Sequence, residues 1–123
     1  MKAKLLLVED HDDTRNALAT ILRGRGYNVA CAKSGTEAVK LATKSLFDLV
    51  LMDHGLPDGN GCGFMKTLHD VYKLEGIALT ANAYESDERM SREAGFLAHL
   101  TKPIDTTKLC SAIEKVLSKK AES

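Results

Sequence analysis

The chain has 123 residues, a length that suits one domain with one hydrophobic core. Its 44% hydrophobic and 28% charged residues exclude an intrinsically disordered chain, and its 17 basic and 17 acidic residues leave no net charge. A nucleic-acid partner held through its phosphates is therefore not expected, because that contact needs a basic surplus. No apolar run is long enough to span a membrane or to form a signal peptide.

Short apolar runs alternate with segments of helical period along the chain. The runs at residues 5–8, 29–31, 49–52 and 77–79 are continuously apolar, as in parallel strands covered by helices on both faces, and a weaker run follows at 96–100. Ser34 and Glu37 form a capping box that opens the second predicted helix. Residues 85–93 are almost entirely polar, so a helix there would be held weakly. The pattern predicts an α/β fold of (βα)5 type, with a parallel sheet and right-handed crossovers.

Cysteine and histidine usage limits the possible functions. The three cysteines, Cys31, Cys62 and Cys110, are widely spaced and odd in number, which favours reduced thiols in a cytoplasmic protein. The four histidines are scattered singly and predict no zinc cluster. Since the chain shows no linker, repeat or low-complexity tract, we expect a single domain over residues 1–123 with its folded core at about 4–117.

Polar and charged residues directly follow four of the predicted strands. Glu9 and Asp10 follow the first strand, and Asp53, Thr80 and Lys102 follow the third, fourth and fifth. The carboxyl ends of parallel strands meet at one edge of the sheet, where ligands bind in open α/β folds. Two like charges ~4 Å apart repel by about 4 kcal/mol at an effective dielectric constant near 20, so three carboxylates there require a counter-ion. Oxygen ligands suit Mg²⁺ or Mn²⁺, and metal, lysine and hydroxyl together suit phosphoryl transfer.

Four short motifs at these strand ends resemble those of a known family. They are Val8-Glu9-Asp10, Leu51-Met52-Asp53, Leu79-Thr80-Ala81 and Thr101-Lys102-Pro103. Their order and spacing resemble a response-regulator receiver domain, with the chemotaxis-type fold, over essentially the whole chain. The resemblance implies a doubly wound, flavodoxin-like sheet of five parallel strands in the order 2-1-3-4-5. Residues 55–58 and 94–103 look most like receivers attached to hybrid sensor histidine kinases.

The resemblance implies a phosphoacceptor and a metal site. Asp53 would take a phosphoryl group from a phosphohistidine, with a histidine kinase or a histidine phosphotransfer domain as the partner. Asp10 and Asp53 would bind Mg²⁺ directly, joined by the backbone carbonyl of Gly55, while Glu9 would act through a bound water. Such a domain promotes only its own phosphorylation and dephosphorylation, so we expect no separate enzyme activity. We also expect no organic cofactor and no membrane contact.

The resemblance further implies how the site would respond. Lys102 would pair with the phosphoryl oxygens, and Thr80 would hydrogen-bond one of them in the active state. His99 stands at the position of the second switch residue, where tyrosine or phenylalanine is usual. The bond between Lys102 and Pro103 is expected to be cis. Two further departures are His54, which replaces an apolar residue after the acceptor, and the Pro-Asp-Gly-Asn-Gly sequence at 57–61, which leaves the shape of that loop open.

Two other functions remain open at this point. Residues 10–14 spell D-x-D-x-T, which resembles the first motif of haloacid-dehalogenase-like phosphatases with Asp10 as the nucleophile. Against this, Asp105 stands alone where an acidic pair is needed, and the chain is short for that fold. A pseudo-receiver that docks partners without phosphorylation would lack an acceptor, a metal ligand or the lysine. The aspartate that carries the phosphoryl group, Asp53 or Asp10, distinguishes a receiver from a phosphatase.

Overall fold

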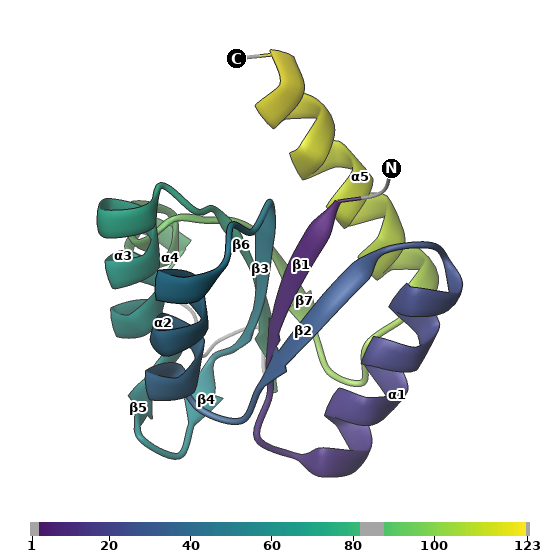
Figure 1. Ribbon diagram of the computed structural model, residues 1–123, viewed down its shortest axis with the longest axis horizontal. Helices are drawn as coiled ribbons and strands as arrows, with labels where there is room; N and C mark the ends of the chain where they lie inside the picture. The colour runs from purple at the N-terminus through teal and green to yellow at the C-terminus, as the bar shows by residue number, and fades with distance from the viewer. Residues whose placement is uncertain (1–2, 82–87, 123) are drawn as a thin grey trace.

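The computed structural model describes residues 3–81 and 88–122, and a parallel sheet lies at its centre (Figure 1). The sheet contains β1 (Lys4–Val8), β2 (Asn28–Ala32), β3 (Leu49–Asp53), β6 (Gly76–Thr80) and β7 (Phe96–Thr101) in the order β2-β1-β3-β6-β7. All neighbouring pairs are parallel. This confirms the expected 2-1-3-4-5 order, because β4 (Gly55–Leu56) and β5 (Gly59–Asn60) belong to a separate hairpin.

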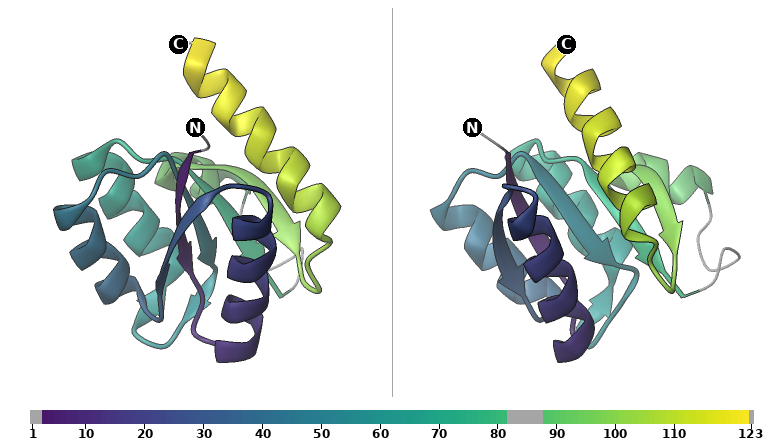
Figure 2. Two further views of the ribbon diagram at one scale, coloured as in Figure 1. Left: turned by 45° about the vertical axis from the view of Figure 1, so that its right-hand side comes forward. Right: turned by 90° about the vertical axis from the view of Figure 1, so that its right-hand side faces the viewer.

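Helices cover both faces of the sheet (Figures 1 and 2). Helices α1 (Asp12–Gly24) and α5 (Thr106–Glu122) pack on one face, whereas α2 (Gly35–Lys44), α3 (Gly61–Tyr72) and α4 (Glu88–Ala94) pack on the other. In β1, Leu5 and Leu7 point into the core on the side of α1 and α5. Leu6 and Val8 point into the core on the side of α2, α3 and α4. All four are fully buried, which explains why the strand is continuously apolar rather than alternating.

The loop after β3 forms a short antiparallel hairpin, in which Gly55 pairs with Asn60 and Leu56 with Gly59. Asp58 lies in its turn, and the carboxylate accepts hydrogen bonds from the backbone nitrogens of Gly35 and Thr36 at 3.1 and 2.9 Å. It also accepts one from the Thr36 hydroxyl at 2.6 Å. The hairpin is thereby attached to the first turn of α2, where the positive end of the helix dipole favours a carboxylate.

The start of α2 agrees with the sequence, and α5 extends to the end of the described residues. The Ser34 hydroxyl accepts a hydrogen bond from the backbone nitrogen of Glu37 at 3.1 Å, as the capping box predicts. Helix α5 continues to Glu122, because residues such as Lys and Ala favour a helix even where they add nothing to the core. Of the polar segment 85–93, the structure describes only the part from Glu88 onward. No helix among the described residues is long and apolar enough to cross a membrane.

Candidate functional site

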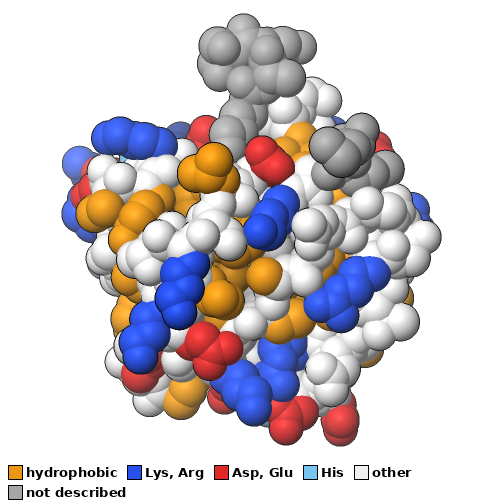
Figure 3. Space-filling view, viewed as in Figure 1, with side chains coloured by type: hydrophobic (Ala, Val, Ile, Leu, Met, Phe, Trp, Pro, Cys, Tyr) orange, Lys and Arg blue, Asp and Glu red, His pale blue; other side chains and the backbone are white. Residues whose placement is uncertain are grey.

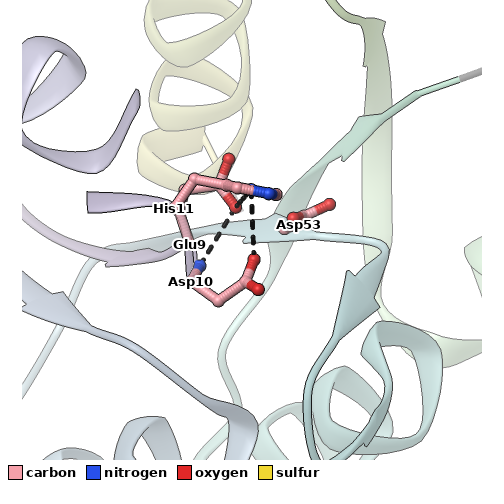
Figure 4. A group of neighbouring side chains, drawn as sticks. All are labelled: Glu9, Asp10, His11 and Asp53. Carbon is pink, nitrogen blue, oxygen red and sulfur yellow. Dashed lines mark hydrogen bonds and ion pairs between the residues drawn. The ribbon is translucent and has the colours of Figure 1, made fainter. Parts of the chain in front are cut away.

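Three carboxylates gather at the carboxyl edge of the sheet (Figure 4). Glu9 and Asp10 follow β1, and Asp53 ends β3, its neighbour in the sheet. One carboxylate oxygen from each of these residues and one ring nitrogen of His11 all lie within 4.8 Å of one another. Glu9 is fully buried and Asp53 is 5% exposed, whereas the Asp10 side chain keeps 32% of its surface exposed. The topology therefore brings the predicted acidic ligands together, as the strand ends suggested.

Lys102 is the nearest cation to this cluster among the described residues. Its Nζ lies 2.9 Å from Oε1 of Glu9 and 3.2 Å from Oδ2 of Asp53. The backbone nitrogen of Lys102 donates to the carbonyl oxygen of Thr80 at 2.7 Å, and the following bond to Pro103 is cis, as expected. In this structure the ammonium group thus occupies the space between two carboxylates, where its charge offsets part of their repulsion.

Burial and charge change the proton affinities in this cluster. The pKa of Glu9 is raised from 4.5 to about 7, mainly because burial disfavours its charge, and next because of the hydrogen bond with Asp53; Lys102 opposes the rise. Partial burial works to lower the pKa of Lys102. The hydrogen bond to Glu9 and the charges of Asp53 and Glu9 outweigh it, so that the pKa is raised. Lys102 therefore stays charged near neutral pH, while Glu9 is poised between its two forms.

Close backbone contacts hold Asp53 in position. His54 donates its backbone hydrogen to the carbonyl oxygen of Leu79 at 2.9 Å, and Gly61 donates to that of His54 at 2.8 Å. A Cβ at Gly61 would lie 2.6 Å from the carbonyl oxygen of Asp53, so only glycine allows this approach. Gly55 donates to Oδ1 of Asp53 at 3.3 Å, and a Cβ at Gly55 would meet no atom within 4 Å. Asp53 is thus closely packed on its α3 side and open on its Gly55 side.

The residues present fit a hard divalent cation. Oδ1 of Asp10 is buried and accepts no hydrogen bond within the described part of the chain, although Nδ1 of His11 lies 3.3 Å away. A buried carboxylate oxygen left in this state is costly in the absence of a partner. Carboxylate oxygens from Glu9, Asp10 and Asp53 are the donors that Mg²⁺ and Mn²⁺ accept. The cluster therefore has both the charge and the donor chemistry for such an ion.

Thr80 and His99 lie at different distances from the carboxyl edge of the sheet. Thr80 ends β6 and is 1% exposed. His99 on β7 pairs with Ala78, and its ring centroid lies 6.2 Å from that of Phe96. Because Ala78 and Thr80 project from the same face of β6, His99 is a diagonal neighbour of Thr80 rather than its direct partner, which is Thr101. Thr80 therefore lies at the same edge of the sheet as the carboxylates. His99 lies two residues further from that edge, level with Ala78.

Sequence reasoning missed two residues of this region, His11 and Arg15. The Arg15 side chain is buried, and its Nη1 donates to the backbone oxygen of Glu9 at 2.9 Å while Nη2 contacts Oδ1 of Asp12 at 2.5 Å. The guanidinium thereby holds the loop that carries the acidic residues. One signal was available: Arg15 precedes Leu18 by three residues and so continues the buried stripe of α1. His11 gave no such signal, because it lies outside every apolar stripe.

Comparisons with known proteins agree with this arrangement. A family model described as the response regulator receiver domain matches residues 5–114. The polar-differentiation response regulator DivK of Brucella ovis is 32% identical over 120 residues, covering 95% of this chain and 98% of that protein. A CheY-like receiver domain protein from Methanospirillum hungatei has a TM-score of 0.92 at 25% identity, covering 99% and 98% of the two chains.

A further solved relative comes from the co-crystal structure of the Saccharomyces cerevisiae histidine phosphotransfer signalling protein Ypd1 with the receiver domain of its downstream response regulator Ssk1. Its TM-score is 0.87 at 28% identity, covering 98% of this chain and 92% of that one. Family model, full-length relatives and solved structures thus agree over nearly the whole chain. This chain belongs to the response regulator receiver domain family.

Proposed function

We propose that the chain is the phosphoacceptor of a two-component phosphorelay and that Asp53 takes a phosphoryl group from a phosphohistidine. One observation carries this proposal. Asp53 ends the buried strand β3 with Oδ2 only 3.2 Å from Nζ of Lys102, inside a cluster whose acidic residues fit a divalent cation. Nucleophile, cation and metal donors are what transfer to a carboxylate requires.

The residues of the site have different roles in the proposed transfer. A carboxylate oxygen of Asp53 attacks phosphorus, the P–N bond of the donor phosphohistidine breaks, and the donor imidazole leaves. Mg²⁺, when bound, would neutralise charge on the phosphoryl oxygens, with Asp10, Asp53 and the Gly55 carbonyl as direct ligands and Glu9 acting through water. Lys102 is placed to exchange its contact with Asp53 for one with a phosphoryl oxygen, because its side chain reaches both carboxylates from the end of β7.

The partner we propose is a histidine kinase or a histidine phosphotransfer domain, whether the chain acts alone or within a hybrid kinase. A groove between α1 and the segment after β7 supports this, since it runs up to Lys102 and is lined by apolar residues such as Ala17, Ile21 and Ile104. A donor helix seated there would bring its phosphohistidine to the acidic edge. Such a helix-in-groove contact is a common mode of recognition.

Charge and thiols support the remaining parts of the proposal. Basic and acidic side chains lie among one another on the face drawn in Figure 3, in keeping with the absence of net charge and with a protein rather than a nucleic acid as partner. Cys31, Cys62 and Cys110 carry free thiols, which fits a cytoplasmic location. The chain would then act as a phosphorylated switch and would not turn over a separate substrate.

The proposal is tested by the intact mass after incubation with a small-molecule phosphodonor. Wild type with Mg²⁺ should gain one phosphoryl group, which peptide mapping should place on Asp53. Asp53→Asn, and wild type with EDTA, should gain none. An undiminished gain in Asp53→Asn would overturn the proposal, and a phosphoryl group on Asp10 would instead indicate the phosphatase chemistry of the D-x-D-x-T motif. A wild type that never gains mass would indicate a pseudo-receiver.

A further inference from the structure

His11 lies beside the acidic cluster, although the proposed reaction gives it no role. It is the N-cap residue of α1, but its side chain makes no capping hydrogen bond. The imidazole is 69% exposed, with Nδ1 at 3.3 Å from Oδ1 of Asp10 and 3.7 Å from Oε2 of Glu9. Figure 4 shows the ring turned back over these carboxylates, from the same loop that carries them. A nitrogen donor therefore faces a site that otherwise offers only oxygen.

The distances suit ligands of one shared ion. Zinc–nitrogen and zinc–oxygen bonds are about 2.0–2.2 Å long, so two ligands on one ion lie at most about 4.3 Å apart, and adjacent ones about 3 Å. The separation of Nδ1 from Oδ1 of Asp10, a proposed direct ligand, is 3.3 Å and falls in this interval. Oε2 of Glu9, which would act through water, lies 3.7 Å from Nδ1. The four possible ligand atoms of Glu9, Asp10, His11 and Asp53 all lie within 4.8 Å of one another. A small movement of the exposed ring and of Asp10 towards the other carboxylates would bring these atoms within range of one ion. Oδ1 of Asp10, the atom nearest the ring, accepts no hydrogen bond within the described residues.

Donor type decides which cation such a site prefers. Carboxylates and water suit Mg²⁺, whereas an imidazole shifts the preference towards late first-row metals. We propose that Nδ1 of His11 is a ligand of the cation held by Glu9, Asp10 and Asp53, and that it makes this site favour Co²⁺ and Zn²⁺ over Mg²⁺. The inference rests on the proposed function, because the same carboxylates would hold Mg²⁺ for phosphoryl transfer. A late first-row ion bound here would exclude Mg²⁺.

A second role for His11 makes the opposite prediction. If the ring serves only as a positive partner of the carboxylates, its removal should strengthen the binding of every divalent cation by a similar factor. If the ring is a ligand, its removal should weaken Co²⁺ and Zn²⁺ selectively. The ratio of Co²⁺ to Mg²⁺ affinity therefore distinguishes the two roles. Loss of the positive charge of His11 alone would leave this ratio unchanged.

The experiment titrates the whole chain with Co²⁺ at pH 7.5 and follows its visible absorption, then displaces Co²⁺ with Mg²⁺. His11→Ala should weaken Co²⁺ binding by about tenfold or more and change Mg²⁺ binding by less than about threefold. His69→Ala is the matched control, because Nδ1 of His69 also lies 3.3 Å from a carboxylate oxygen, that of Asp70 on the exposed side of α3. Diamagnetic Zn²⁺ should shift the ring signals of His11 in NMR spectra and leave those of His69 unchanged.

The outcomes separate this inference from the proposed function. An unchanged ratio of Co²⁺ to Mg²⁺ affinity in His11→Ala would overturn ligation by His11, while phosphorylation of Asp53 in Mg²⁺ could still be observed. Selective loss of Co²⁺ in His11→Ala, in a chain that never becomes phosphorylated, would support the metal site and overturn the phosphoacceptor role. A chain that binds neither ion would overturn the inference. Because His11 is exposed, the variant should unfold at the wild-type temperature.

Discussion

Nζ of Lys102 lies 2.9 Å from Oε1 of Glu9, a contact between residues 93 positions apart in the chain. Glu9 is fully buried, so this contact supplies positive charge to a carboxylate that water does not reach. The same ammonium lies 3.2 Å from Asp53. Under the proposed function, a phosphoryl group transferred to Asp53 would therefore meet a cation already in place, and Lys102 would exchange its contact with Asp53 for one with a phosphoryl oxygen.

The first prediction concerns Lys102→Ala, which should still bind Mg²⁺ but lose the conformational response to phosphorylation. Its free energy of unfolding should fall by about 2 kcal/mol, less than the roughly 3–5 kcal/mol of a fully buried broken pair, because the lysine is 24% exposed. Urea unfolding and NMR spectra with beryllofluoride measure the two effects. Exposed Lys108→Ala is the control and should change neither. Normal spectral changes of Lys102→Ala with beryllofluoride would contradict the prediction.

The second prediction concerns pH. Because the folded-state pKa of Glu9 is raised to about 7, its protonated form favours the fold. The stability that Glu9 contributes is then fully present below its ordinary pKa of 4.5 and is lost as the pH rises through about 7. With EDTA present, wild type should lose on the order of 2 kcal/mol relative to Glu9→Gln between pH 4.5 and 8. Urea midpoints measure this difference, and a wild type that gains stability relative to Glu9→Gln over this range would exclude the assignment to Glu9.

The third prediction compares two glycines of α3. A Cβ at Gly61 would lie 2.6 Å from the carbonyl oxygen of Asp53, whereas one at Gly63 would meet nothing within 4 Å. Gly61→Ala should therefore lose about 1–3 kcal/mol of stability and phosphorylate more slowly, because the Asp53 backbone must move. Gly63→Ala should be neutral or more stable by up to about 1 kcal/mol. Equal stabilities of the two variants in urea would show that the close approach is not limiting.

The fourth prediction concerns the contact between Asp58 and α2. The pKa of Asp58 is lowered, chiefly by the hydrogen bond from the Thr36 hydroxyl, so its contribution is present above the ordinary pKa of 3.8 and is lost as the pH falls below it. Asp58→Ala should have a lower urea midpoint than wild type at pH 7, and this difference in midpoint should become smaller at acidic pH. Asp58→Asn keeps one acceptor oxygen, so its midpoint should lie between those of wild type and Asp58→Ala. A gap that is the same at pH 3 and pH 7 would show that the charge of Asp58 contributes nothing.

The fifth prediction concerns the readout. His99 lies on the same face of the sheet as Thr80, one step from the acidic edge, and packs against Phe96. If it is the second switch residue, its ring must turn as Thr80 moves towards the phosphoryl group. Its imidazole signals in NMR spectra should therefore shift on addition of beryllofluoride and Mg²⁺ at pH 7.5, whereas those of His69 should not. Unchanged His99 signals at full occupancy would rule out the switch role.

Much of the fold could be predicted from local pattern. Each strand of the central sheet is largely apolar because both its faces are covered, so runs such as Leu5 to Val8 identify strands without knowledge of their neighbours. The capping box of Ser34 was readable for a similar reason, since its partners lie within one turn. The hairpin after Asp53 was not readable: Asp58 is held by Gly35 and Thr36, more than 20 residues away.

By itself, the sequence determined which residues could do the chemistry. Carboxylates, a hydroxyl and a lysine stand at the carboxyl ends of the strands, and a parallel sheet brings these ends together at one edge. Only the tertiary structure decided how these groups pair, because pairing depends on distances of a few ångströms between segments far apart in the chain. It placed Lys102 between Glu9 and Asp53, Arg15 beneath the acidic loop and His11 over it. Burial, which raises the pKa of Glu9, also exists only after the chain has folded.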